Sequence, residues 1–171
     1  TEGNVFNEKG QEVYEGYNKH LDEIIKAVII CNEAVFYREK DGFVYHGDAV
    51  DIAFLVMGYK YGFSSELIFN NIILVQDIPF ESERSYSARF YQENGMLKVA
   101  IKGAFEIILP LCTSMMYENR VQNIDRALLK DQALNLAKQG YRIITVATGE
   151  ITQEKRSYTH NDIHSLTFLG F

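Results

Sequence analysis

A strand-like stretch that runs directly into a helix-like stretch most constrains how this chain can fold. Residues 96–101 alternate as in a strand with one buried face, and residues 105–109 are mostly apolar, as in a short buried helix. Lys102 and Gly103 join the two, which brings together an ammonium, a backbone without Cβ and the unpaired N–H groups of a helix start. That combination suits a phosphate-bearing ligand, although lysine and glycine are also ordinary turn residues.

The composition limits the class of protein. The 171 residues are 47% apolar and include 11 phenylalanines and 11 tyrosines, which is enough for one sizeable core. The formal net charge of −6, without clusters of Lys and Arg, argues against a nucleic-acid surface. We therefore expect one domain over residues 1–171, in which an anionic ligand would be met by a few local charges.

The cysteines indicate the cellular compartment, and the chain ends indicate a relation to a larger protein. Cys31 and Cys112 lie in apolar contexts and are expected to be buried free thiols in a reducing compartment. No apolar stretch is long enough for a membrane span, so we expect a soluble, cytosolic piece. The chain begins at Thr1 rather than methionine and stops at Phe171 after an apolar segment. We expect a domain excised from a larger protein.

Short-range patterns predict several helices and strands. Helical spacing of apolar residues and capping residues predict helices over 20–32, from Asp48 to Gly62, over 103–111 until Pro110 disturbs it, and over 124–139. Alternating or β-branched runs predict strands over 34–37, 43–46, 72–78, 86–92, 96–101, 142–148 and 166–169. Pro79 is expected to end the strand 72–78, and Asn94-Gly95 is a strong hairpin signal. The result is an α+β fold with a mostly antiparallel sheet and helices on one or both faces.

Other residues could join Lys102 in a ligand site. Strand parity turns the apolar side of 96–101 toward helices and places Lys102 on the opposite side, next to the small Ala100. Phe80 precedes a polar stretch, so its ring either stacks on a ligand at the edge of the sheet or belongs to the core. Asp48 and Asp51 begin a helix, where capping and the helix dipole favour carboxylates whatever their function.

Four separate segments match motifs of one known family. They are 102–106 (K-G-A-F-E, similar to K-G-A-x-E), 47–55 (G-D-A-V-D-I-A-F-L, similar to G-D-x-x-E-x-A-L-L), 78–82 (I-P-F-E-S, similar to I-P-F-x-S) and 140–142 (G-Y-R, similar to G-x-R). Cys31-Asn32, 166–170 and the opening Thr1-Glu2-Gly3 also fall where that family would have them. The chain resembles the nucleotide-binding (N) domain of P-type cation-transporting ATPases, with calcium pumps as the closest-looking subgroup. The resemblance implies a six- or seven-stranded antiparallel sheet flanked by helices, inserted between the two halves of a phosphorylation domain.

The resemblance also implies that the chain binds ATP. Phe80 would stack on adenine, Lys102 would line the pocket beside the base, and Gly103 would let the base approach. Arg142 would meet the ribose and the phosphates, and Ser82 would be a hydrogen-bond partner or simply a turn residue. These roles agree with the chemistry of the side chains, since rings stack and guanidinium groups hold phosphates.

Two positions depart from the family pattern. Asp51 stands where the family usually has a glutamate that accepts from the adenine amino group, and its shorter side chain would reach the amine through water. The family commonly has a lysine at the position of Ser85, and Arg84 lies just before it here. Strand alternation would turn Arg84 away from the site unless the segment is irregular. Without a cation at this position, the phosphates would be bound more weakly.

The implied role lies within a larger pump. The chain contains neither D-K-T-G-T nor G-D-G-x-N-D, so we expect it to bind ATP (Mg-ATP in the parent) without hydrolysing it. It would present the γ-phosphate to the phosphorylation domain, with the actuator domain as a further partner. The expected location is a cytoplasmic domain of an integral membrane protein, without direct membrane contact, and the transported cation is left open.

Two other classes of function are rivals. One is a free-standing ATP-sensing or interaction module, and the other is an enzyme that uses Lys102 as nucleophile or base, with Glu106 as the nearest acid. His160 and His164 have the i, i+4 spacing of a zinc pair, but no cysteine or third histidine is near them in the sequence. We therefore expect no metal site.

Overall fold

A seven-stranded sheet forms the centre of the computed structural model, which describes residues 3–63, 65–153 and 155–171. In spatial order its strands are β5 (Ile73–Glu81), β6 (Tyr86–Glu93), β7 (Met96–Gly103), β10 (Thr145–Glu150), β11 (Leu166–Gly170), β8 (Cys112–Tyr117) and β9 (Arg120–Asn123). Every neighbouring pair is antiparallel except β11 and β8. Two small hairpins stand apart from this sheet, β1 (Val5–Phe6) with β2 (Glu12–Val13) and β3 (Val35–Glu39) with β4 (Gly42–His46). The predicted α+β fold with a mostly antiparallel sheet is confirmed.

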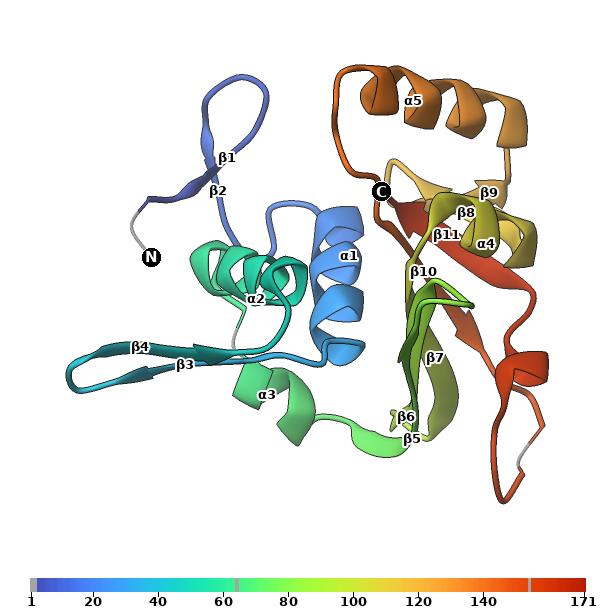
Figure 1. Cartoon of the computed structure of the whole chain (residues 1–171), viewed down its shortest axis with the longest axis horizontal. Coiled ribbons are helices and arrows are strands. Elements are labelled where there is room, and N and C mark those ends of the chain that lie inside the picture. Colours follow the sequence, from blue (N-terminus) through green and yellow to red (C-terminus); the bar gives the residue numbers. More distant parts are fainter. Residues whose placement is uncertain (1–2, 64, 154) are drawn as a thin grey trace.

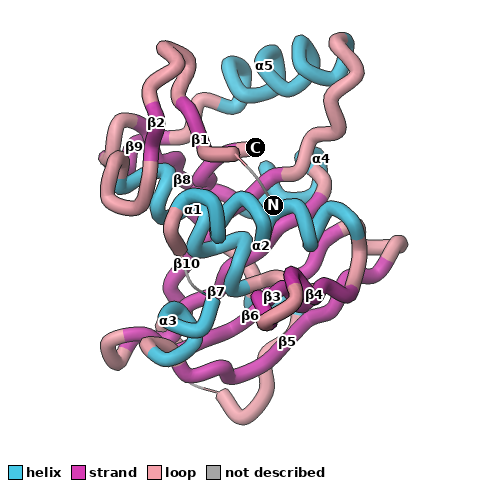
Figure 2. The backbone as a smooth tube through the Cα atoms, turned by 90° about the vertical axis from the view of Figure 1, so that its left-hand side faces the viewer, coloured by secondary structure: helices cyan, strands magenta, loops and turns pink. Residues whose placement is uncertain are grey.

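Helices cover both faces of the sheet (Figure 1). They are α1 (Lys19–Ile30), α2 (Ala49–Tyr61), α3 (Ser65–Asn70), α4 (Phe105–Ile108) and α5 (Arg126–Lys138), with 3-10 turns at Leu109–Leu111 and His160–Asp162. The view in Figure 2, turned toward the α1 side, shows α1 and α2 lying across the sheet, and Figure 1 shows α4 on its other side. None of these helices is long and apolar enough to cross a membrane, among the residues that the structure describes.

The alternation along β7 divides the core into two layers. Leu97, Val99 and Ile101 belong to a cluster with residues of α4 and α5, as the strand parity predicted. Ala100 points the other way and is fully buried in a second cluster with α1. Lys102 follows on this second side, so the helices α1 and α2 determine what surrounds its ammonium.

Local capping chemistry explains the helix ends. The Asn18 side chain accepts from the backbone N–H groups of His20 and Leu21 at the start of α1, and Asp48 accepts from Val50 N–H at 2.8 Å at the start of α2. Gly62 ends α2 with φ of +104°, a conformation that favours glycine. The predicted positions of both helices are confirmed to within about two residues.

Several boundaries differ from the prediction. β5 does not stop before Pro79 but continues to Glu81, because β5 is an edge strand and its register shifts between Ile78 and Glu81, where a missing N–H is tolerated. Gly103 is the last residue of β7 rather than the first of a helix. The strand expected from Arg142 begins only at Thr145. The helix α3 and the hairpin β8–β9 were not predicted, and Thr1 and Glu2 lie outside the described residues.

Candidate functional site

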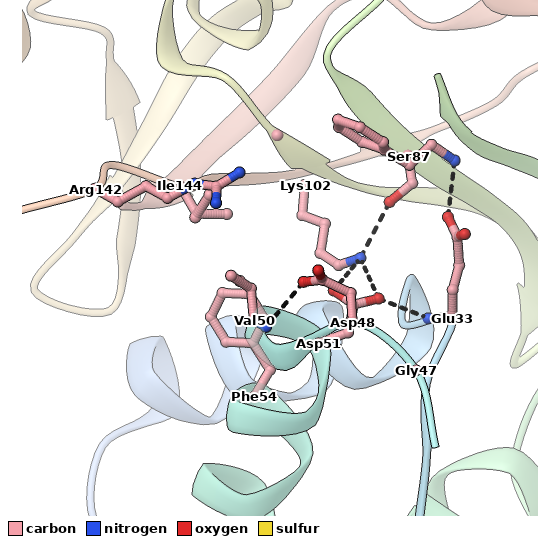
Figure 3. A pocket seen from close by; sticks show the side chains of 12 residues that line it. Glu33, Gly47, Asp48, Val50, Asp51, Phe54, Ser87, Lys102, Arg142 and Ile144 are labelled. Carbon is pink, nitrogen blue, oxygen red and sulfur yellow. Dashed lines mark hydrogen bonds and ion pairs between the residues drawn. The ribbon is translucent and has the colours of Figure 1, made fainter. Parts of the chain in front are cut away.

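A cavity of about 400 Å³ opens between the start of α2 and the ends of β5, β6 and β7 (Figure 3). Five of the six residues singled out in the sequence line it: Asp51, Phe80, Lys102, Gly103 and Arg142. These residues come from four different segments of the chain. The structure therefore brings together most of the proposed site, and only Ser82 is missing from the lining.

The floor of the cavity is a buried ion pair. The Lys102 ammonium lies 2.9 Å from Asp51 Oδ1, and it donates to Asp51 Oδ2 and to Ser87 Oγ, both at 3.1 Å. Only 7% of Lys102 is exposed, and two of the three N–H donors of its ammonium are used in hydrogen bonds to Asp51 and Ser87. In this arrangement the positive charge of Lys102 is held at a fixed place in the floor of the cavity.

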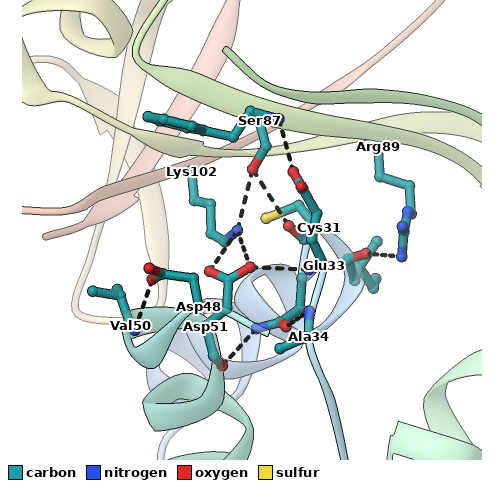
Figure 4. Close-up of polar contacts among 12 residues, drawn as sticks. Cys31, Glu33, Ala34, Asp48, Val50, Asp51, Ser87, Arg89 and Lys102 are labelled. Carbon is teal, nitrogen blue, oxygen red and sulfur yellow. Dashed lines mark hydrogen bonds and ion pairs between the residues drawn. The ribbon is translucent and has the colours of Figure 1, made fainter. Parts of the chain in front are cut away.

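Asp51 is held from several sides (Figure 4). Besides Lys102, its carboxylate accepts the backbone N–H of Glu33 at 3.0 Å, and its backbone carbonyl accepts Asn32 Nδ2 at 2.9 Å. Asp51 lies in the first turn of α2, where the helix dipole also favours a carboxylate. Removing either member of such a buried pair leaves an uncompensated charge, so the pair fixes this side of the cavity.

Phe80 stands at the mouth of the cavity on the edge strand β5. Its side chain is 52% exposed, so it is not the core phenylalanine that the sequence left as an alternative. Its backbone N–H does not join the sheet but donates to Glu33 Oε1 at 2.8 Å, at the point where the register of β5 shifts. The irregular strand thus leaves the ring partly free beside the cavity.

Gly103 has a structural reason to be glycine. A Cβ at this position would lie 2.4 Å from the Ser85 carbonyl oxygen and 2.5 Å from Tyr86 Cβ, because β7 pairs closely with the start of β6. This packing explains the glycine without a ligand. The expected approach of a ligand base to Gly103 stays a prediction.

Arg142 and Arg84 differ in what surrounds them. Arg142 is exposed in the connection before β10, and its guanidinium has no hydrogen-bond or ion-pair partner among the described residues. Arg84 lies in a turn over 82–85 and pairs with Glu81 at 2.5 Å, away from the cavity lining. The segment is irregular, and Arg84 does not line the cavity. The backbone oxygen of Ser82 accepts a hydrogen bond from Ser85 Oγ at 2.9 Å in this turn.

Two polar residues of the site, Glu33 and Ser87, were not predicted from the sequence. Glu33 lines the cavity beside Phe80, and its only sequence signal was its place after Cys31-Asn32. Ser87 lines the floor because it lies directly opposite Lys102 in the β6–β7 hairpin. A hairpin turning at Asn94-Gly95 pairs residues whose numbers have a constant sum, so Ser87 could have been found from the predicted turn.

Charges divide the cavity into two ends. Glu33, Asp48 and Asp51 line it together with Lys102 and Arg142. Figure 3 shows Arg142 on the far side of Lys102 from Glu33. Glu33 therefore marks an acidic end beside the connection between α1 and β3, and Arg142 marks a basic end near the start of β10.

Burial or neighbouring side chains account for both thiols and for His160 and His164. Burial raises the pKa of the Cys31 thiol, behind the cavity floor, to about 12, so it stays protonated at neutral pH. His160 contacts the Tyr86 hydroxyl, and His164 lies near Ser165. Within the described ranges, no three residues of the types His, Cys, Asp and Glu come together in a way that could hold a metal ion.

Comparisons with known proteins agree on one family. The model of the family described as "P-type ATPase, cytoplasmic domain N" matches residues 20–171. "Cation-transporting ATPase pma1" of Synechocystis is 28% identical over 174 residues, which cover 98% of this chain and 19% of that protein.

Other relatives carry the names of different transporters. "Sodium/potassium exporting P-type ATPase cta3" of Schizosaccharomyces pombe is 30% identical over 84% of this chain and 14% of its own length. "Calcium-transporting ATPase" of Bacillus subtilis is 26% identical over 97% of this chain and 19% of its own length. The chain thus spans a fifth or less of the length of these relatives.

Proposed function

Because this chain belongs to the P-type ATPase cytoplasmic domain N family, we propose that it binds ATP in the cavity between α2 and the β5–β6–β7 end of the sheet. One observation carries the proposal. Asp51, Phe80, Lys102, Gly103 and Arg142, chosen from sequence motifs as far as 91 positions apart (142 − 51), line the same cavity. An apolar-lined cavity with a few convergent charges is the usual form of a small-molecule site.

The two ends of the cavity suggest the orientation of the nucleotide. The half-exposed ring of Phe80 offers a stacking surface for adenine at the acidic end. The unpaired guanidinium of Arg142 offers donors for the ribose and phosphates at the basic end. The triphosphate would then lie away from the Glu33 carboxylate, which lowers the repulsion between like charges.

The floor of the cavity would contribute to binding by holding a positive charge at a fixed place beside the base. Lys102 keeps one positive charge beside the base, held by Asp51 and Ser87. With two donors engaged by Asp51 and Ser87, it would attract the nucleotide chiefly through the field of its charge. Gly103 leaves the backbone next to it without a side chain.

In the whole protein, the chain would act as the nucleotide-binding part of a cation-transporting ATPase. It would hold Mg-ATP on the cytoplasmic side and carry the γ-phosphate to an aspartate of the phosphorylation domain, while the actuator domain acts later in the cycle. The contribution of this part is proximity and orientation, delivered by movement of a domain. The relatives are named for calcium and for sodium and potassium, so the proposal covers a cation pump and no particular ion.

An NMR titration tests the binding proposal. Adding ATP to ¹⁵N-labelled protein should shift the amide signals of Phe80, Gly103 and Glu33 first, and signals of α5 should stay in place. If no amide shifts, or if the shifts gather at a different surface, the chain does not bind ATP in this cavity.

A Lys102-based enzyme is disfavoured by the geometry. An amine that forms a Schiff base must lose its proton and expose its lone pair, whereas this ammonium is paired with Asp51 and bonded to Ser87. Glu106, the acid considered for such chemistry, does not line the cavity. A free-standing ATP-sensing module would use the same site, and finding the phosphorylation motif in the rest of the polypeptide would decide against it.

A further inference from the structure

Glu33 offers one anchored and one free carboxylate oxygen beside Phe80. Its Oε1 accepts the Phe80 backbone N–H at 2.8 Å. Its Oε2 has no hydrogen-bond or ion-pair partner in the part of the chain that the structure describes, although the residue lines the cavity. A strong acceptor is therefore held at a fixed place next to the exposed ring.

The backbone around Glu33 is fixed as well (Figure 4). The Glu33 N–H donates to Asp51 Oδ2 at 3.0 Å, and Asn32 Nδ2 donates to the Asp51 carbonyl at 2.9 Å. Asn32 Oδ1 also accepts the Ala34 N–H at 2.8 Å. These bonds tie the connection between α1 and β3 to α2, while the Glu33 side chain ties it to β5. Such preorganisation is what a specificity-determining group needs.

The Asp51 carboxylate is less accessible to a ligand than that of Glu33. Its Oδ2 accepts from both Lys102 and the Glu33 N–H, and its Oδ1 lies 2.9 Å from the Lys102 ammonium. Asp51 is also only 9% exposed. A ligand amine near Phe80 therefore meets the free oxygen of Glu33 more readily than the occupied carboxylate of Asp51.

We propose that Glu33 is the specificity-determining residue for the base: Oε2 accepts a hydrogen bond from the exocyclic amine of a purine stacked on Phe80. The cavity then selects a purine with an amino group at position 6 over one with a keto group, whose oxygen would face a carboxylate. This inference rests on the proposed function and assigns its base selectivity to one side chain. Discrimination arises because the wrong base leaves a polar group unpaired or repelled.

Replacing Glu33 by glutamine should reverse the selectivity. The Phe80 N–H still needs an acceptor, so the amide oxygen turns toward Phe80 and the amide NH₂ turns toward the ligand. That NH₂ can donate to the keto oxygen of inosine triphosphate but cannot accept from the amine of ATP. A residue with a purely structural role would not produce this reversal.

Isothermal titration calorimetry with ATP and inosine triphosphate tests the inference. The wild-type protein should favour ATP by about tenfold, a difference typical of one charge-assisted hydrogen bond. Glu33→Gln should favour inosine triphosphate, and Glu33→Ala should bring the ratio of the two affinities close to one. Glu39→Gln is the matched control, because Glu39 is an exposed carboxylate on the β3–β4 hairpin outside the cavity, and it should keep the wild-type ratio.

The ratio of the ATP affinity to the inosine triphosphate affinity, measured for each variant, separates the outcomes. Circular dichroism first verifies that each variant folds, and Glu33→Ala gives a reading independent of the glutamine orientation. If the wild type binds ATP and both Glu33 variants keep its ratio, or if Asp51→Asn alone reverses it, the inference is wrong while ATP binding stands. If the wild type binds neither nucleotide, the proposed function is wrong and the inference fails with it.

Discussion

Replacing Phe80 by alanine separates binding from stability more clearly than any other change at the site. The ring is 52% exposed, and the hydrogen bond at this position comes from the backbone N–H, which alanine keeps. Truncating a fully buried phenylalanine costs about 3–5 kcal/mol, so roughly half of that contact should cost less than about 2.5 kcal/mol of unfolding free energy. Stacking of a base on an aromatic ring contributes about 1–3 kcal/mol, so the Kd for ATP should rise about 5- to 150-fold.

Calorimetric titration with ATP measures the change in affinity, and urea denaturation measures the change in stability. Phe6→Ala is a suitable control, because Phe6 is a phenylalanine with a similar exposed fraction of 57% that does not line the cavity. It should leave the Kd unchanged. An unchanged Kd in Phe80→Ala, with normal folding, would refute the idea that the base stacks on this ring.

Two further predictions concern buried charges. Lys102→Met leaves Asp51 without its partner and should lower the unfolding free energy by about 3 kcal/mol in urea denaturation, and adding Asp51→Leu should recover part of the loss. Burial tends to raise the pKa of Glu93, but hydrogen bonds and charges from Lys26 and Lys98 outweigh it and hold the pKa below its usual 4.5. A lowered folded-state pKa stabilises the fold above the unfolded-state value and loses that effect as the pH falls through the folded-state value. Glu93→Gln should therefore have a lower melting temperature than the wild type at neutral pH. Its melting temperature should fall less than that of the wild type as the pH drops below about 4.5, which thermal melting at several pH values can check.

Helices α1 and α2 could be predicted from the sequence because nearby capping residues determine where they begin and end. Asn18 and Asp48 cap helices through their side chains, and Gly62 ends α2 in a left-handed conformation, all of which depend on residues a few positions away. The extent of β5 could not be found in this way. Pro79 breaks an interior strand but not an edge strand, and only the order of strands in the folded sheet shows which kind β5 is.

The candidate site was only partly accessible from the sequence. Motif resemblance supplied Phe80, Lys102 and Arg142, but strand parity alone could not show that α2 would place a carboxylate against Lys102. Glu33 belongs to no matched motif, and its importance comes from contacts across the fold to β5 and α2. Side-chain interactions between distant segments are the part of a site that local patterns do not encode.

The contacts divide the cavity into a fixed floor and accessible walls. Lys102 and Asp51 are buried and bonded to each other, so a ligand that entered would not need to break this pair. Phe80, Glu33 and Arg142 are exposed and keep a ring face, a carboxylate oxygen and a guanidinium available. Changes in the floor should therefore lower the stability of the fold as well as the affinity, whereas changes in the walls should act on affinity at nearly constant stability. For each variant, the change in ATP affinity can be compared with the change in unfolding free energy. This comparison distinguishes a preformed nucleotide site from a cavity in which the buried ion pair must break before a ligand binds.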